Sequence, residues 1–541
     1  MITDIVINPE NKKRWYEEGW WTNETMHLAW MRQMFKGQNR EYVSDDLGTR
    51  YTFKEIDKRA RRLASWLASV GVENGDVVSF QMPPWAEFCV IYVACTWVGA
   101  VIHPLSTAFN GGDLVYCMNL VGSKAYLAPT FNHKTNHEEQ ILGVVDQIPT
   151  LSRDAIAVCD RLAPAKECIT IDEIVERYIT YPYGCPAKAD DVALILSTSG
   201  TTGRPKQVLY THNTLIAAER TFNEGLHLGP DDVMFMPAPL SHATGFNHGL
   251  IAPLIQGGRV VLQHKFDAKE ALKIIKKEGV TWSMGATPFI TELLEASDET
   301  GLSLEPLELY VCGGAPVPKE LIKRAADHGV LLCEDYGSTE SSPHVFVPRE
   351  KCLEWNGDWS GIPYEGIEVK VVDSRGNEVP RGVQGEEISR GPNVFVGYLN
   401  NPEATARDLS EDGWFHSGDL CIMDEQGRIK INGRKKEIII RGGENISCIE
   451  VDEHVKKCPL VADCATVGMK DERMGERIAT FVVPANNGQT PTKDDIVEFL
   501  ENDGVAKRLW PEHIELIDSI PMTETGKIRR NQLAKELEDR L

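Results

Sequence analysis

Short apolar stretches alternate with amphipathic stretches through the first third of the chain, and this alternation most constrains the fold. Residues 52–55 fit a helix capping box, and the apolar residues that follow at spacings of four and three predict an amphipathic helix ending near Gly71. Residues 77–80 then predict a strand, residues 85–99 a buried helix and residues 101–102 the next strand. Strands separated by helices usually pair in parallel, so we expect an α/β fold.

The size and composition of the chain set wider limits. Its 541 residues, of which 42% are apolar, exceed what one core can organise, so we expect roughly three or four compact units. The longest apolar run, residues 88–102, has 15 residues, which predicts a buried helix and no transmembrane segment. The 13 cysteines include no C-x-x-C pair, and we see no charged and then apolar leader. We therefore expect reduced thiols and a cytoplasmic location.

The charge of the chain is strongly negative, but basic residues gather locally. A net charge of −23 disfavours nucleic acids and anionic membrane surfaces as partners, because both are negatively charged. Lysines and arginines cluster over residues 434–441 and again over residues 527–530. Arg529 and Arg530 can be explained as ordinary solvent-exposed charges. That explanation fits less well for the basic residues that have glycines beside them. This arrangement is suited to binding small polyanions at chosen places.

A loop rich in hydroxyl groups and glycine lies at residues 197–206, between an apolar strand over residues 192–196 and what we expect to be the start of a helix. Its sequence is Ser-Thr-Ser-Gly-Thr-Thr-Gly-Arg-Pro-Lys. Glycines let backbone N–H groups converge on phosphate oxygens, hydroxyls add donors and Lys206 adds a positive charge. Loops of this kind are also common as solvated turns. Because ligands of open α/β sheets bind at the carboxyl ends of strands, we predict a nucleoside triphosphate site here.

Two better-known phosphate motifs do not fit this chain. Pro205 stands where the second glycine of the P-loop pattern G-x-x-x-x-G-K-[ST] belongs, and Ile528 follows the later Gly526-Lys527 pair. The sequence contains no G-x-G triplet, so the dinucleotide-binding fingerprint is also missing. The expected site therefore belongs to neither a P-loop ATPase nor a Rossmann dehydrogenase of the usual kind.

The composition of the chain changes after Gly385. Short apolar runs separated by turn residues there predict a small β-rich subdomain. Residues 438–440 then predict a strand, a capping-box pattern opens a helix over residues 447–457, and a further strand and helix follow over residues 481–501. These elements predict a compact α/β unit of about 100 residues, a usual size for a domain. We place the boundary before it at Lys436.

Five further segments resemble this loop in composition, and the first two place small residues beside a possible strand end. They are residues 313–316, 335–340, 414–419, 434–445 and 523–527. Together with the hydroxyl-rich loop, in this order and spacing, they closely resemble the signature motifs of the adenylate-forming superfamily. That superfamily contains acyl-CoA synthetases, beetle luciferases and the adenylation domains of peptide synthetases. The resemblance covers nearly the whole chain, from about Tyr51 to Lys527.

The resemblance implies an architecture. We expect an α/β protein in which a large N-terminal body of α/β subdomains, together with a small β-rich subdomain, binds the acid and ATP over residues 1–435. A small mobile C-terminal α/β domain over residues 436–541 would act as a lid. It would carry the catalytic lysine and the face used in the CoA step. The oligomeric state cannot be deduced from these motifs.

The resemblance also implies a role for each matched residue. The loop would grip the β- and γ-phosphates, Glu340 would hold Mg²⁺, and Tyr336 would pack against adenine. The expected catalytic residues are Lys527, Glu340, Thr201 and His242. The expected ATP- or AMP-binding residues are Thr198, Ser199, Gly200, Thr201, Thr202, Gly203, Lys206, Gly314, Ala315, Asp335, Tyr336, Gly337, Ser338, Thr339, Asp419, Arg434 and Lys527. Gly442, Gly443 and Glu444 would bind CoA, Lys436 would be the hinge, and His242, Phe246, Gly285, Ala286 and Gly337 would line the acyl pocket.

Three segments point to a narrower group within the superfamily. Residues 236–246, 285–289 and 337–344 look like those of bacterial short- and medium-chain fatty acyl-CoA ligases and cyclohexanecarboxylate-CoA ligases. The expected reaction joins a carboxylic acid to CoA with ATP, giving acyl-CoA, AMP and diphosphate through an acyl-adenylate. Short or medium aliphatic acids are the expected substrates; an alicyclic or aryl acid is the alternative. One residue departs from the pattern, because Gln207 stands where relatives usually have glycine.

Other functions fit less well. Amino-acid activators carry an aspartate for the substrate ammonium near the His242 segment, and residues 238–248 contain none. A non-catalytic AMP-binding protein would have no need of Glu340, Asp419 and Lys527. Luciferase-like oxidation is possible in principle, but nothing in the sequence calls for it. Since one lysine must reach the α-phosphate and then give way to a thiol, we expect the lid to rotate between two half-reactions.

Overall fold

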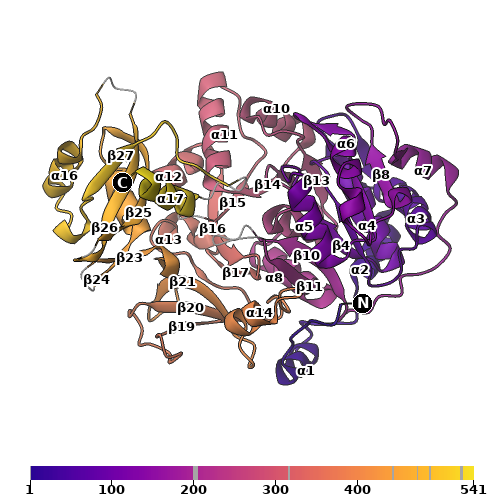
Figure 1. Ribbon diagram of the computed structural model, residues 1–541, viewed down its shortest axis with the longest axis horizontal. Helices are drawn as coiled ribbons and strands as arrows, with labels where there is room; N and C mark the ends of the chain where they lie inside the picture. The colour runs from indigo at the N-terminus through magenta and orange to yellow at the C-terminus, as the bar shows by residue number, and fades with distance from the viewer. Residues whose placement is uncertain are drawn as a thin grey trace.

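The computed structural model describes residues 2–198, 205–314, 317–441, 444–471, 473–485, 489–523 and 528–540, without the side chains of Lys436 and Asn445. Figure 1 shows a large body, coloured indigo to orange, and a smaller C-terminal unit in gold at one end. The expected α/β architecture is confirmed. Among the described residues, no helix has the length and apolar character needed to cross a membrane.

A seven-stranded sheet carries the hydroxyl-rich loop. Its strands, in spatial order, are β11 (Gln207–Thr211), β10 (Val192–Ser197), β4 (Val101–Pro104), β3 (Val77–Phe80), β5 (Ala125–Pro129), β8 (Ile156–Cys159) and β9 (Ile169–Thr170). Parallel pairing joins β10 to β4, β4 to β3, and β3 to β5, as predicted. The helices of this region are α3 (Phe53–Ser69), α4 (Ala86–Val98), α5 (Gly111–Val121), α6 (His137–Leu142) and α7 (Ile171–Arg177).

A nine-stranded sheet forms the other half of the body. Its order is β18 (Ile362–Pro363), β17 (Ser341–Phe346), β16 (Leu331–Ser338), β15 (Leu309–Gly313), β14 (Trp282–Gly285), β12 (Val233–Met236), β13 (Arg259–Leu262), β1 (Glu41–Asp45) and β2 (Arg50–Thr52). Its helices include α8 (His212–Gly225), α9 (Ala252–Gln256), α10 (Ala268–Glu278), α11 (Thr287–Thr300), α12 (Lys319–Asp327) and α13 (Cys352–Trp355). The N-terminal segment adds α1 (Pro9–Glu17) and α2 (Met26–Gly37).

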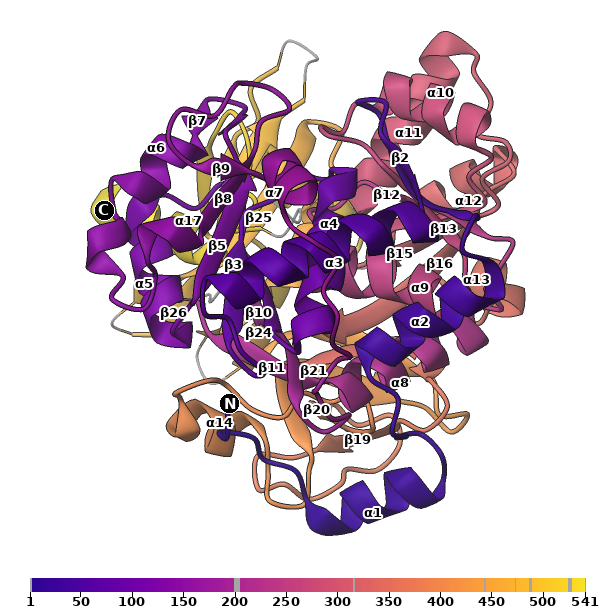
Figure 2. The same cartoon turned by 90° about the vertical axis from the view of Figure 1, so that its right-hand side faces the viewer.

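One apolar core joins the two large sheets. Every residue of α4 is buried, and α4 shares a core with Val78 of β3, Leu194 of β10 and Met234 of β12. Figure 2 shows the two sheets side by side, with α3 and α4 across the front. The predicted helices are confirmed here: both hydrogen bonds of the capping box at Thr52 and Glu55 are present at the start of α3.

The predicted start of a helix directly after the hydroxyl-rich loop is wrong. The loop instead joins β10 to β11 in an antiparallel hairpin, in which Ser197 pairs with Gln207, and α8 begins only at His212. Residues 207–211 are all buried and contain valine, leucine, tyrosine and threonine, which favour a strand at this edge of the sheet. The loop still lies at the carboxyl end of β10, as expected.

The β-rich subdomain starts earlier than the composition indicated. Its four antiparallel strands are β19 (Glu368–Val372), β20 (Gly385–Arg390), β21 (Phe415–Met423) and β22 (Ile429–Arg434), and α14 (Pro402–Asp408) lies between β20 and β21. The first strand precedes Gly385 because Val371 and Val372 of β19 are both buried, on opposite faces of the sheet. Val371 packs in a cluster with Cys421, and Val372 packs in another with Trp414.

The C-terminal unit has cores of its own, made of residues from Ile439 onward. Its sheet contains β24 (Glu444–Ser447), β23 (Ile438–Arg441), β26 (Gly475–Pro484), β25 (Val461–Asp471) and β27 (His513–Leu516). Its helices are α15 (Cys448–Val455), α16 (Lys493–Asn502) and α17 (Arg530–Arg540). Ser447 caps α15 by accepting the N–H of Glu450, as predicted, but the helix ends two residues before Lys457.

Candidate functional site

The described ends of the hydroxyl-rich loop are fixed by the hairpin. The N–H of Thr198 donates to the carbonyl oxygen of Lys206 at 2.9 Å, which closes the loop at its base. The Thr198 hydroxyl oxygen is buried and has no hydrogen-bond partner within the described part of the chain. The expected phosphate-binding residues Ser199, Gly200, Thr201, Thr202 and Gly203 lie outside the described residues.

A buried polar network supports this hairpin from beneath. The Gln207 side-chain oxygen accepts from the Ser197 hydroxyl at 3.0 Å and lies 3.2 Å from His103 Nε2. His103 Nδ1 in turn lies 2.7 Å from the Ser79 hydroxyl. Burial lowers the pKa of His103 to about 4, so its ring is neutral at pH 7 and can donate from Nε2 while accepting at Nδ1. Gln207 therefore anchors Ser197, the first residue of the loop.

Four side chains meet beside the start of β11: Lys206, Glu340 from the turn between β16 and β17, Tyr398, and Asp408 at the end of α14. The Lys206 ammonium lies 3.1 Å from Asp408 Oδ2 and 3.7 Å from Glu340 Oε1. The Tyr398 hydroxyl lies 2.7 Å from the same Glu340 oxygen and 3.0 Å from the same Asp408 oxygen. The structure thus brings together Lys206 and Glu340, two residues that the sequence assigned to one ligand.

Tyr398 and Asp408 were not among the residues predicted from sequence. Asp408 is 202 positions from Lys206 along the chain. It ends α14, and Tyr398 is brought to the hairpin because residues 396–399 hydrogen-bond along β11. No motif of the sequence marks either residue, and a contact of this kind becomes visible only when the chain has folded.

A second cluster of side chains forms around Tyr336 of β16, four residues before Glu340. The Tyr336 hydroxyl donates to Asp419 Oδ2 at 2.6 Å, and Arg434 Nε donates to Asp419 Oδ1 at 2.8 Å. Asp419 and Arg434 are direct partners across the antiparallel strands β21 and β22. The charge of Asp419 raises the pKa of Arg434. Three residues that the sequence assigned to the nucleotide are therefore in contact, although their motifs are far apart in sequence.

Buried ionisable groups lie beneath Tyr336. His344 packs against its ring with centroids 4.7 Å apart, and His344 Nε2 lies 3.4 Å from Glu387 Oε1. Burial acts to lower the pKa of His344, but the charge of Glu387 and the hydrogen bonds to Glu387 and Ser341 together outweigh burial and raise it. His344 ends one of the matched segments, but Glu387 lies outside all of them, so the sequence did not reveal that the two residues pair.

The small residues at the ends of β15 and β16 lie close together. Gly313 and Asp335 are register partners on these parallel strands, and Gly314 follows with φ of 93°, a conformation that favours glycine. Asp335 is buried and accepts from the Tyr364 hydroxyl at 2.8 Å. Burial raises the pKa of Asp335 to about 6. Ala315 lies outside the described residues.

The turn after Asp335 is closely packed. A Cβ atom on Gly337 would lie 3.1 Å from the carbonyl oxygen of Ser341. The Ser338 hydroxyl accepts from the N–H of Ser341 at 3.2 Å, and the carbonyl oxygen of Thr339 accepts from the buried Tyr210 hydroxyl. The backbone of this segment is thus fixed from several sides, which positions Tyr336 and Glu340 at its two ends.

Two of the residues expected to line the acyl pocket, Phe246 and Gly285, come from a π-helix over Thr244–Ile251 and from β14 beside it. Phe246 is fully buried, with ring centroids 6.2 Å from Phe88 and 5.9 Å from Tyr92. A Cβ atom on Gly285 would lie 2.7 Å from the Tyr310 hydroxyl. Apolar and aromatic groups therefore surround this region.

His242 and Ala286 lie at the ends of these elements. His242 Nδ1 accepts from the N–H of Thr244 at 3.3 Å, which fixes its ring before the π-helix. The carbonyl oxygen of Ala286, at the start of α11, lies 3.5 Å from the Tyr310 hydroxyl. Within the π-helix, a Cβ atom on Gly245 would lie only 2.1 Å from the carbonyl oxygen of Pro239, so only glycine fits there.

Behind the π-helix lies a buried ion pair that the sequence did not reveal. His248 Nδ1 lies 2.9 Å from Glu219, and His248 Nε2 lies 3.1 Å from the Ser342 hydroxyl. Burial acts to lower the pKa of His248, but the charge of Glu219, its hydrogen bond to the ring and the charge of Asp335 together outweigh burial and raise it. This pair connects α8 to β17, the strand that follows Glu340.

The expected lid residues are only partly described. Lys527, Gly442 and Gly443 lie outside the described residues, and for Lys436 only the backbone is described. Glu444 begins β24 and is the register partner of Arg441. The neighbours of Lys436 face different units: Lys435 lies 3.0 Å from Glu386 of β20, whereas Glu437 lies 3.2 Å from Arg530 of α17.

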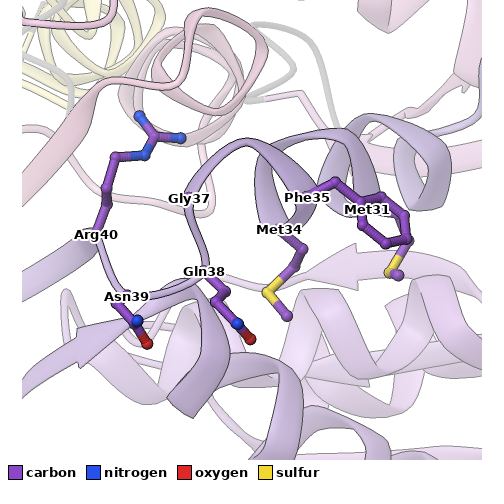
Figure 3. Close-up of a pocket in the computed structure, with 7 residues that line it drawn as sticks. All are labelled: Met31, Met34, Phe35, Gly37, Gln38, Asn39 and Arg40. Carbon is purple, nitrogen blue, oxygen red and sulfur yellow. The ribbon is translucent and has the colours of Figure 1, made fainter.

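A surface groove elsewhere contains none of the predicted site residues. It has a volume of about 620 Å³ and lies at the C-terminal end of α2, as Figure 3 shows. Its lining residues are Met31, Met34, Phe35, Gly37, Gln38, Asn39 and Arg40. The Phe35 side chain is 84% exposed, so the groove is open to solvent.

Comparison with known proteins gives consistent matches along the chain. The family described as AMP-binding enzyme matches residues 31–399, and the AMP-binding enzyme C-terminal domain matches residues 450–527. A medium-chain fatty-acid–CoA ligase of Escherichia coli (strain K12) is 39% identical over 541 residues, covering 100% of this chain and 95% of the relative. A feruloyl-CoA synthase of Amycolatopsis sp is 32% identical, covering 90% of this chain and 94% of the relative.

Solved structures agree with the fold. ATP-bound MatB from Rhodopseudomonas palustris superposes with a TM-score of 0.85 at 26% identity, covering 96% of this chain and 99% of that one. The anthranilate CoA ligase AuaEII in complex with anthranoyl-AMP superposes with a TM-score of 0.86 at 22% identity, covering 96% and 98% of the two chains. The second likeness concerns the fold alone.

Proposed function

Because the chain belongs to the family of AMP-binding enzymes and is an AMP-forming ligase of carboxylic acids and CoA, we propose that it activates medium-chain fatty acids. The full-length similarity to a medium-chain fatty-acid–CoA ligase supports this acid class. The aromatic and aliphatic surroundings of Phe246 suit an apolar acyl chain. The similarity to a feruloyl-CoA synthase keeps an aryl acid as the second candidate.

The reaction needs activation because a carboxylate resists nucleophiles and has no good leaving group. In the first step a carboxylate oxygen attacks the α-phosphorus of ATP, the bond from this phosphorus to the bridging oxygen breaks, and diphosphate leaves. In the second step the CoA sulfur attacks the acyl carbon, the bond to the adenylate oxygen breaks, and AMP leaves. Negative charge crowds the phosphorus in the first step, so positioned cations and N–H groups stabilise it.

One observation supports the assignment of the nucleotide site above all others. Two clusters of side chains lie at the two ends of one short segment, residues 336–340. Tyr336 is in contact with Asp419, which Arg434 also binds, and Glu340 lies beside Lys206. We assign Asp419 and Arg434 to the ribose and its neighbouring phosphate, and Lys206 with the loop to the β- and γ-phosphates. Tyr336 would pack against adenine, beside Gly314. We assign His242 to the wall between the acyl chain and the adenylate.

Glu340 fits a role as a ligand of Mg²⁺. Its side chain is 13% exposed and one of its oxygens faces Lys206, where we place the phosphates. Among the residues that the structure describes, no group of three or more His, Cys, Asp or Glu side chains is placed to bind a metal, so phosphate oxygens would complete the ligand set. Proteins commonly hold Mg²⁺ by one or two carboxylates plus substrate phosphates. When bound, the ion neutralises charge on the transferred phosphate.

The lid would serve the two steps in turn. We assign Lys527 to the oxygens around the α-phosphorus in the first step, and Gly442, Gly443 and Glu444 to the approach of CoA in the second. The position of Lys436, between a residue paired with the body and one paired with α17, suits a hinge.

The acid class is tested by measuring diphosphate release with straight-chain acids from butanoate to dodecanoate, cyclohexanecarboxylate, benzoates and ferulate. We expect the highest kcat/KM with medium-chain acids and lower values for aromatic acids. A clear preference for ferulate or a benzoate would overturn the proposal for the acid while leaving the ligase reaction in place. Omitting CoA should leave acyl-AMP as the product.

A further inference from the structure

Lys206 already has an anionic partner on the protein. Its ammonium is 3.1 Å from Asp408 Oδ2, and it also lies over the ring of Tyr398, 3.8 Å from the ring centroid. The side chains of Lys206 and Asp408 are 26% and 17% exposed, so water screens their attraction only in part. Asp408 can therefore compete with other anions for the positive charge of Lys206.

Asp408 is held in its charged form by more than Lys206. Arg407 donates to both of its carboxylate oxygens, at 2.7 and 2.8 Å. Burial acts to raise the pKa of Asp408, but the hydrogen bond from Arg407 and the charge of Lys206 outweigh burial and lower the pKa. Asp408 therefore keeps a cationic partner when Lys206 moves away from it. Breaking the contact does not leave a half-buried carboxylate without a cation.

We propose that Asp408 is a positioning residue that competes with the ATP phosphates for Lys206. The inference rests on the proposed role of Lys206 in binding the β- and γ-phosphates. One ammonium group cannot neutralise a carboxylate and a phosphate fully at the same time, so each anion weakens the hold of the other. Asp408 thereby lowers the affinity for ATP.

The same competition acts on the product. After the α-phosphorus has been transferred to the acid, diphosphate occupies the place of the β- and γ-phosphates. When Asp408 takes Lys206 back, diphosphate loses a cationic contact and its release becomes easier. A residue that weakens ATP binding thus also weakens product inhibition, and the two effects come from one contact.

The first test is the variant Asp408→Asn, which keeps the shape of the side chain and removes its charge. We expect the KM for ATP and the inhibition constant for diphosphate each to fall about fivefold, the scale of a partly screened ion pair. Glu403→Gln on the same helix removes an equal charge away from Lys206, and we expect it to leave both constants unchanged. An unchanged or higher KM for ATP in Asp408→Asn would overturn the inference.

A double-mutant cycle separates this inference from the function on which it rests. We expect Lys206→Gln to raise the KM for ATP, and Asp408→Asn to have no effect on ATP binding in the Lys206→Gln background. If Lys206→Gln leaves the KM unchanged, the assignment of Lys206 to the phosphates fails. If Lys206→Gln raises it but Asp408→Asn has the same effect in both backgrounds, only the competition fails.

A second variant, Asp408→Ala, allows the same test if Asp408→Asn does not fold. Asp408 is the last residue of α14, so Asp408→Ala is compatible with the helix. The dissociation constant for ATP, measured by calorimetry without an acid substrate, should fall in this variant as in Asp408→Asn. A higher dissociation constant in a folded Asp408→Ala protein would show that Asp408 helps to hold Lys206 in place for ATP, contrary to the proposal.

Discussion

Gln207 ties the first residue of the hydroxyl-rich loop to the neighbouring strand β4. Its side-chain oxygen accepts from Ser197 and lies within hydrogen-bond distance of His103, and its residue is only 1% exposed. This chain therefore has a fixed support on the sheet side of the loop. A fixed base restricts the loop before ATP binds, which reduces the conformational entropy lost on binding.

We expect Gln207→Leu to raise the KM for ATP about fivefold, because it removes the support and leaves Ser197 and His103 without their partner. The free energy of unfolding should fall by about 1–3 kcal/mol for the same reason. Steady-state kinetics with varied ATP and denaturant unfolding measure the two effects. Gln81→Leu is the control: Gln81 is also buried and hydrogen-bonded, to Tyr126, but it lies away from the loop. Equal changes in the KM for ATP in both variants would contradict this role.

Gly285 determines how much room exists beside the π-helix. An added Cβ would lie 2.7 Å from the Tyr310 hydroxyl and 2.9 Å from the Phe289 ring, so Gly285→Ala forces one of these aromatic groups to move. We expect kcat/KM for the longest accepted acid to fall about tenfold and that for butanoate to fall less, with the KM for ATP unchanged.

The matched control for this variant is Gly184→Ala, because an added Cβ at Gly184 meets no atom within 4 Å. Measuring the acid series with both variants separates lost room from a general effect of substitution. A uniform loss over all chain lengths in Gly285→Ala would argue that the residue serves packing and does not line the acyl pocket.

At the scale of elements, local sequence patterns predicted those helices and strands whose local preference is the same as the structure that tertiary packing favours. The capping box at Thr52 begins α3, and the continuous apolar run at residues 88–102 contains the fully buried α4. The hairpin after Ser197 was missed because residues 207–211 are an edge strand whose partner, β10, lies across the loop. Periodicity within one segment cannot show which neighbour completes its hydrogen bonds.

The same reasoning applies to the candidate site. Tyr336, Asp419 and Arg434 were predicted because each lies in a segment that carries a recognisable motif, and they are in contact in the structure. Asp408 and Tyr398 were missed because their importance comes from reaching Lys206, and no local pattern encodes that contact. Sequence motifs therefore identified the residues that we assign to the nucleotide better than the residues that contact them from other segments.

His103 joins three strands through one buried ring, and this predicts an acid-dependent loss of stability. Burial lowers its pKa to about 4 in the folded protein, whereas an unfolded chain binds the proton near pH 6.5. The unfolded state therefore holds more protons between these values, so the contribution of His103 to stability is complete above pH 6.5 and is lost as the pH falls to about 4. The total loss from this group is up to about 3 kcal/mol.

Denaturant unfolding at a series of pH values from 7 to 4 measures this dependence. We expect His103→Gln to be less stable at pH 7 but to show a shallower fall in the free energy of unfolding on acidification. His227→Asn, which replaces an exposed histidine with a residue that tolerates its positive φ, should keep the slope of the original protein. An unchanged slope in His103→Gln would mean that other groups carry the acid sensitivity.

At the scale of the whole molecule, the body and the C-terminal unit have separate cores, and the chain between them is short. Lys435 is paired with the body and Glu437 with α17, so the backbone between them connects two independently packed units. Figure 1 shows the C-terminal unit at one end of the body. Units with separate cores can change their relative orientation without disturbing either core.

Two variants on different parts of the C-terminal unit test whether it presents two faces in turn. We expect Lys527→Ala to slow acyl-adenylate formation at least 100-fold, because it removes the cation that we assign to the α-phosphate. Thioester formation from supplied acyl-AMP should change little. Gly443→Trp should do the opposite: exchange of labelled diphosphate into ATP continues while transfer to CoA is blocked, because a large side chain fills the approach of the thiol. Loss of both half-reactions to the same extent in either variant would contradict the rotation, and circular dichroism with thermal unfolding controls for misfolding.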